Sequence, residues 1–183
     1  MSRLVATEHC PLEWAFTSGR KYGDPFDEID LDVLIKDSEG REWRVPTYWS
    51  GGNEWRIRFS PPAPGEYTYR TACTIETDSD LHGQEGSISA GPYEGENPLL
   101  KHGPLRASEN KRYLEHQDGT PFFWMADTAW NGPLRSTDED WDHYLETRTS
   151  QRYTAVQWIA TQWHGRPEGD IDGRVAYTGK ETI

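Results

Sequence analysis

The stretch from Phe122 to Trp130, FFWMADTAW, carries the most chemically suggestive residues of the sequence. An apolar run leads directly into Asp127, and Trp130 follows it. Carboxylates and amides bind sugar hydroxyls through paired hydrogen bonds, and indole rings stack on the apolar faces of sugars. Further amide, indole and imidazole groups lie on or just after the apolar segment 154–160. We therefore predict a carbohydrate-binding site that contains Asp127, Trp130, Gln157, Gln162, Trp163 and His164.

These residues also have a structural interpretation, which the sequence leaves open. Asp127 could cap the turn that follows its strand, and Trp130 could fill a gap between strand and helix. Asp127 is the one carboxylate that the sequence places suitably for this site, and no catalytic residues are identified.

The sequence offers little support for metal binding, nucleophilic catalysis or phosphate binding. The six histidines do not fall in HExxH or another ligand spacing, so we expect no metal. No GxSxG motif is present, and neither Cys10 nor Cys73 lies in a loop that resembles a site. Gly51-Gly52 lacks the rest of a phosphate-binding fingerprint. We expect no cofactor, and two buried reduced thiols rather than a disulfide.

The elements that position the candidate site change character along the chain. Residues 11–92 alternate between apolar and polar positions, and turn residues interrupt the pattern every 8–12 residues, which is typical of a β-sandwich. The Gly/Pro-rich stretch 91–98 then marks a domain edge. We predict a sandwich over residues 1–92, and a linker with a β-hairpin over 93–120. Trp43 and Trp55 are expected in the sandwich core, and Trp49 at an exposed position.

Residues 121–160 predict a strand, a helix and a second strand. The strand 122–126 precedes a capping box at Ser136-Thr-Asp-Glu139, and Trp141, Tyr144, Leu145 and Arg148 then form one stripe of a helix. A crossover of this length makes the two strands parallel. Two parallel strands cannot bury their faces alone. We infer that residues 121–183 begin a (βα)₈ barrel, which needs about 200–250 residues, and that the chain is part of a longer protein.

Composition limits the partners. The formal net charge of −12 disfavours nucleic acid. No apolar run is long enough to span a membrane, and no secretory signal is visible, so we expect a cytoplasmic location. Nine Trp and nine Tyr in 183 residues suit a protein that stacks aromatic faces on sugars.

Two segments resemble a known family. RYLEHQDGTPFFWMADTAW and YTAVQWIATQW resemble the start of the apiosidase-like glycoside hydrolases, a barrel family some of whose members carry a collagenase label. VPTYWSGGNEWRIRFSPPAPGEYTYRTAC resembles the Ig-like sandwich that often precedes that barrel. The resemblance implies a two-carboxylate glycosidase for complex, plant-type carbohydrate. It places the catalytic pair on later strands, so this chain alone would be inactive.

Two other interpretations stay open. The sandwich could be a carbohydrate-binding or interaction module with residues 121–183 as an appendage, or the sequence could be a defunct gene fragment. If residues 121–183 are the start of a barrel, one apolar face of their strands lacks its cover in this chain. We therefore also expect self-association.

Overall fold

The computed structural model describes residues 2–161 and 167–175. The chain divides into two compact units, each described separately below. Unit 1 comprises residues 1–106 and 116–120, and unit 2 comprises residues 107–115 and 121–183. The predicted Gln162, Trp163 and His164 lie outside the described residues.

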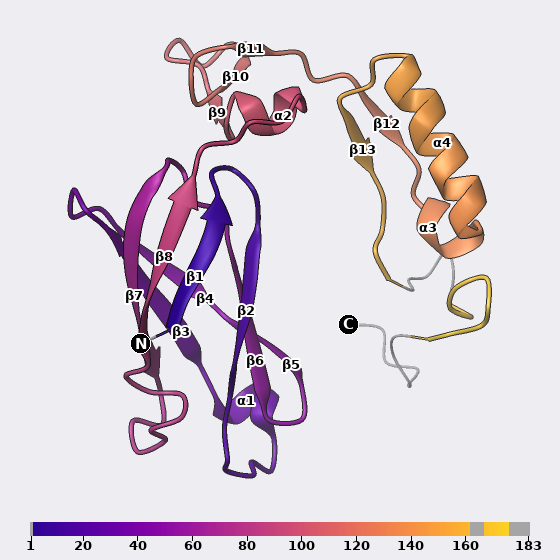
Figure 1. Ribbon diagram of the computed structural model, residues 1–183. Helices are drawn as coiled ribbons and strands as arrows, with labels where there is room; N and C mark the ends of the chain where they lie inside the picture. Colours follow the sequence, from indigo (N-terminus) through magenta and orange to yellow (C-terminus); the bar gives the residue numbers. More distant parts are fainter. Residues whose placement is uncertain (1, 162–166, 176–183) are drawn as a thin grey trace. The chain divides into compact units, whose positions relative to one another are not determined.

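Unit 1 is built from two sheets (Figure 1). The five-stranded sheet has the order β1-β8-β7-β3-β4, and the three-stranded sheet has the order β2-β6-β5. The bounds in the first sheet are β1 Ser2–Thr7, β3 Leu31–Asp37, β4 Glu42–Pro46, β7 Gly65–Cys73 and β8 Glu85–Gly91. Those in the second are β2 Leu12–Thr17, β5 Tyr48–Gly51 and β6 Glu54–Phe59. All pairs are antiparallel except β1 with β8.

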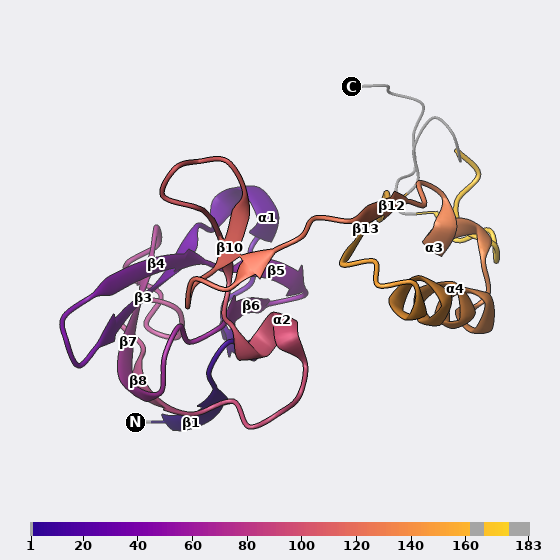
Figure 2. The ribbon, with the colours of Figure 1, turned by 90° about the horizontal axis from the view of Figure 1, so that it is seen from above.

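The core lies between these two sheets because each strand buries alternate residues. Figure 2, seen from above, shows β5 and β6 on one side and β3 and β7 on the other. The most deeply buried side chains come from both layers and include Val33, Ile35, Trp55, Ile57 and Ile88. Trp55 is 1% exposed and Trp49 is 40% exposed, so these two expectations are confirmed, whereas Trp43 is only half-buried and packs against the core.

The turns of unit 1 lie where glycine, proline and aspartate interrupt the alternating pattern of its sequence. Gly40 has a φ of 86°, and its backbone N–H donates to the Asp37 carbonyl between β3 and β4. A side chain other than glycine strains that backbone. Helix α1, Pro25–Glu28, has no counterpart in the prediction. Its single turn is too short to show a helical period, although Asp24 caps it and proline opens it.

The segment that follows the sandwich contains short elements. Helix α2, Pro98–Lys101, begins after the cap Asn97. Strands β9 Leu105–Ala107, β10 Leu114–His116 and β11 Pro121–Phe122 form a sheet in the order β11-β10-β9. His116 makes two contacts in the 116–120 turn. Its Nδ1 lies 2.7 Å from the Gly103 carbonyl oxygen, and its backbone N–H donates to the Thr120 carbonyl.

Unit 2 contains a strand–helix–strand segment whose strands pair in parallel, as predicted. Strand β12, Ala126–Thr128, is followed by α3, Gly132–Arg135, then α4, Asp138–Ser150, and β13, Ala155–Gln157. Helix α4 lies along the β12/β13 pair in Figures 1 and 2. The pairing covers three residues on each strand, with Asp127 opposite Val156.

Two predicted boundaries in this segment were wrong. Residues 122–126 do not form one strand: β11 ends at Phe122, and β12 begins at Ala126 and includes Asp127. The capping box begins at Thr137, one residue later than predicted, and its partner is Asp140. Aspartate can close the same reciprocal pair of hydrogen bonds as glutamate, and this allowed the shift.

The stripe predicted on α4 is confirmed, because Trp141, Tyr144, Leu145 and Arg148 are all half-buried, as is Thr147 beside them. Trp141 stacks on Tyr144 with ring centroids 5.1 Å apart. It also covers Gly132 of α3, where an added Cβ would lie 2.4 Å from the indole. Glycine at this position therefore allows the close approach of α3 to α4.

Candidate functional site

The β12/β13 pair has two faces, and Asp127 identifies the one that faces α4. Its Oδ2 accepts a hydrogen bond from the Tyr144 hydroxyl at 2.9 Å and lies 2.5 Å from Arg148 Nε. Both partners belong to α4. Because Val156 is opposite Asp127 in the parallel register, its side chain lies on the same face.

The three side chains form a polar cluster, which we call the Asp127 clamp: Asp127, Tyr144 and Arg148. The Arg148 guanidinium lies over the rings of both Tyr144 and Tyr153, 5.2 Å from each centroid. Hydrogen bonds from Tyr144 and from the Thr128 backbone, together with Arg148, lower the pKa of the Asp127 carboxyl. Burial and the neighbouring carboxylate raise the pKa of Tyr144. Asp127 is therefore an ionised group that joins β12 to α4.

Two of the other predicted residues, Gln157 and Trp130, lie at the carboxyl ends of the same strands. Gln157 is the last residue of β13 and is exposed. Trp130 follows β12, is 50% exposed, and its carbonyl accepts from the Ile159 backbone N–H at 3.1 Å. Asp127, Trp130 and Gln157 thus come from one end of one strand pair. Their contact with a sugar stays a prediction.

Three residues important to this region were not among the predicted site residues. Tyr144 and Arg148 were predicted only as part of the helix stripe, and Thr128 was given no role in the site. The signal was available in part: on a helix, positions 144 and 148 share a face and can reach the preceding strand together. Thr128 instead pairs with Gln157 at the end of β12.

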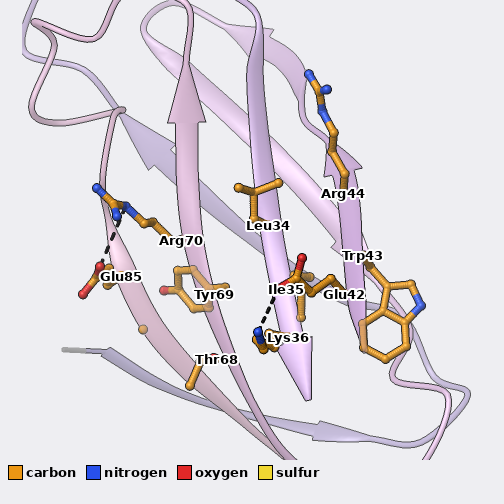
Figure 3. A pocket seen from close by; sticks show the side chains of 11 residues that line it. Leu34, Ile35, Lys36, Glu42, Trp43, Arg44, Thr68, Tyr69, Arg70 and Glu85 are labelled. Carbon is orange, nitrogen blue, oxygen red and sulfur yellow. Dashed lines mark hydrogen bonds and ion pairs between the residues drawn. The ribbon is translucent and has the colours of Figure 1, made fainter. Parts of the chain in front are cut away.

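Unit 1 contains a separate hollow of about 590 Å³ on its five-stranded sheet (Figure 3). Three of its lining residues are cations, and each has a carboxylate partner. Lys36 Nζ lies 2.9 Å from Glu42, Arg70 Nε lies 3.8 Å from Glu85, and Arg44 Nε donates to Asp32 at 2.6 Å. These charges neutralise each other across neighbouring strands, which is typical of a solvated sheet face.

The outward face of the three-stranded sheet also carries a charge cluster. Glu13 binds Arg58 Nε at 2.6 Å, the Tyr48 hydroxyl at 2.9 Å and Arg56 Nη1 at 2.9 Å. These hydrogen bonds lower the pKa of Glu13 to about 2. The Arg58 guanidinium lies 5.1 Å from the centroid of the Tyr48 ring. That exposed aromatic is therefore already stacked on a cation of its own sheet.

Histidines gather near Gly103 in unit 1 without forming a metal centre. His9 Nδ1 lies 2.6 Å from the Leu100 carbonyl, and His102 Nδ1 lies 2.7 Å from Asp118 Oδ2. The Thr120 backbone N–H and His102 together lower the pKa of Asp118 to about 2. Among the described residues, no group of three or more His, Cys, Asp or Glu could hold a metal ion.

The cysteines and the helix lengths bear on two further features of the chain. Cys10 and Cys73 are free thiols, and Cys73 is buried as expected, whereas Cys10 is only half-buried. In residues 2–161 and 167–175, no helix has the length and apolar character needed to cross a membrane.

Comparison with solved structures first shows the class of fold. The chain is similar to a candidate glycoside hydrolase from Bacteroides vulgatus, with a TM-score of 0.74 and 20% sequence identity. The match covers 100% of this chain and 33% of that one, so this chain spans about a third of its length. No match was found among curated proteins.

Family models match both parts of the chain. Residues 108–182 match the apiosidase-like catalytic domain, and residues 6–74 match DUF5060, a domain of unknown function. The resemblance to the apiosidase-like glycoside hydrolases that was stated from the sequence is confirmed.

Proposed function

We propose that this chain is the N-terminal portion of a glycoside hydrolase that cleaves O-glycosidic bonds in complex, plant-type carbohydrate. Unit 1 would be an Ig-like accessory sandwich, and unit 2 would begin a (β/α)₈ barrel. The observation that carries the proposal is the parallel β12/β13 pair, with α4 on one face and polar side chains at its carboxyl end. Barrel enzymes place their sites at that end. The match of residues 108–182 supports the same assignment.

The reaction would use two carboxyl groups, separated by about 5–5.5 Å for retention or about 6.5–9.5 Å for inversion of configuration. We propose that both belong to later strands of the barrel, because Asp127 is bound to Tyr144 and Arg148 on the helix side. Trp130 and Gln157 would contribute to the sugar pocket, together with Gln162, Trp163 and His164. Direct contact of Asp127 with a sugar would require its release from Arg148.

An assay of hydrolysis tests this function. The longer polypeptide that contains this chain and the rest of the barrel would be incubated with neutral arabinan and galactan and with acidic polygalacturonate. We expect reducing sugar from the longer polypeptide and none from this chain alone. Absence of hydrolysis by the longer polypeptide, with polysaccharide binding by this chain in calorimetry, would instead favour a carbohydrate-binding module.

The proposal also predicts that this chain self-associates. Phe123 is 76% exposed and Trp124 is 60% exposed in unit 2. Exposed aromatic surface of this kind promotes association when its natural cover is absent. We expect dimers or larger species at micromolar concentration in sedimentation velocity.

A pair of variants makes this prediction specific. Trp124→Gln should shift the chain towards monomer, whereas Trp49→Gln in unit 1, which replaces an indole that is 40% exposed, should not. A monomeric wild-type chain at these concentrations would contradict the prediction.

A further inference from the structure

Thr128 and Gln157 lie on the face of the β12/β13 pair that is opposite to α4. Asp127 binds α4, and side chains alternate along a strand, so Thr128 points to the other face. On β13 the same alternation can be checked independently. The Trp158 ring makes an edge contact with Trp141 of α4, with centroids 6.0 Å apart, so residue 157 before it faces away from the helix.

The parallel register brings these two polar residues side by side. Thr128 is opposite Gln157, and Ala126 is opposite Ala155 one layer earlier. The face opposite α4 therefore carries two small apolar side chains, followed by a hydroxyl and an amide at its carboxyl end. Both polar side chains are exposed. Within the described residues, neither the Thr128 hydroxyl nor the Gln157 amide has a hydrogen-bond partner in the chain.

The face opposite α4 carries no charged side chain in the described strands β12 and β13. The Asp127 carboxylate, on the residue before Thr128, points to the helix side and is paired with Arg148. In the described strands β12 and β13, which read ADT and AVQ, the face opposite α4 carries no cation that could bind a sugar carboxylate. The formal net charge of −12 further disfavours an anionic substrate.

We propose that Thr128 and Gln157 form a neutral pair that hydrogen-bonds adjacent hydroxyl groups of an uncharged sugar ring. A hydroxyl and an amide can each donate and accept, which matches two neighbouring sugar hydroxyls. The pair would select neutral glycosyl units over uronic acids at this part of the pocket. The inference rests on the proposed function, because it needs the barrel that places this face inside a site.

The experiment uses the longer polypeptide and the same three polysaccharides. Thr128→Val and Gln157→Leu remove hydrogen-bonding groups at nearly constant volume, and each should raise KM about 3- to 10-fold, as expected for one lost hydrogen bond. Thr149→Val is the matched control, because Thr149 is an exposed residue of α4. It should leave KM and kcat unchanged, and all three variants should keep the wild-type Tm.

The outcomes separate the two claims. If the wild type hydrolyses none of the polysaccharides, the proposed function fails and this inference fails with it. If the wild type is active but Thr128→Val and Gln157→Leu behave like Thr149→Val, only the inference is overturned. Preference of the wild type for polygalacturonate over both neutral polymers would overturn it as well. Preference for a neutral polymer, with KM raised in both variants, supports it.

Discussion

Replacement of Trp55 by alanine is expected to lower the free energy of unfolding of unit 1 by about 3–5 kcal/mol, the usual range for removal of a large core aromatic. Trp55 is 1% exposed and lies between the two sheets. Its ring makes an edge contact with Tyr22 at 6.0 Å. The cavity left by alanine would remove the packing contacts between β6 and the residues across the core. Hydrogen exchange of the β6 and β3 amides, followed by mass spectrometry, measures the loss within the intact chain.

Two further variants make the Trp55 prediction specific. The buried indole N–H of Trp55 has no hydrogen-bond partner among the described residues. Trp55→Phe keeps most of the apolar ring and removes that unsatisfied donor, so it should cost only about 1 kcal/mol. Trp49→Ala removes a half-exposed indole from edge strand β5 and should cost less than Trp55→Ala. Equal losses for Trp55→Ala and Trp49→Ala would show that the core is not where we place it.

The second large effect is expected from Asp127→Asn, which removes the charge of the Asp127 clamp. Arg148 and Tyr144 would lose their ionised partner, so unit 2 should be less stable at neutral pH. The pKa of Asp127 is lowered in the folded chain from its ordinary value of 3.8. The stabilisation is therefore fully present above that ordinary value and is lost as the pH falls through the lower folded pKa.

Thermal unfolding at a series of pH values tests the clamp. The Tm difference between wild type and Asp127→Asn should be largest near pH 7 and should shrink as the pH falls below about 4. There the Asp127 carboxyl of the unfolded chain begins to take up its proton, and the folded chain follows at lower pH. Glu146→Gln is the matched control, because Glu146 is an exposed carboxylate of the same helix. A pH-independent Tm difference, or one equal to that of Glu146→Gln, would show that the Asp127 clamp does not stabilise unit 2.

Much of the sandwich could be predicted because its strands have one buried face. Alternation along β6 placed Trp55 correctly in the core, and the same alternation buries Val33 on β3 and Tyr69 on β7. Helix α1 could not be predicted, since a single turn carries no period. The stripe of α4 was predictable for the opposite reason: its 13 residues show the helical repeat several times.

The candidate site was harder to predict because a strand boundary decides which side chains face the proposed site. A strand over 122–126 placed Asp127 beyond its end, at the mouth of a site, whereas β12 includes Asp127. A residue inside a strand points to one of its two faces because side chains alternate, whereas a residue beyond the strand end is not held to either face. The contacts of Asp127 with Tyr144 and Arg148 depend on how α4 packs, which spacing along the chain does not specify.

The most direct test of the central claim is a crystal structure of the longer polypeptide with a neutral product sugar bound. We predict a closed (β/α)₈ barrel in which β12 and β13 are adjacent strands. The sugar should lie at their carboxyl ends, with its hydroxyls within hydrogen-bond distance of Thr128 and Gln157. The Asp127 carboxylate should remain on Arg148. A sugar bound on the sheets of unit 1, or a β12/β13 pair that is not part of a barrel, would contradict the account.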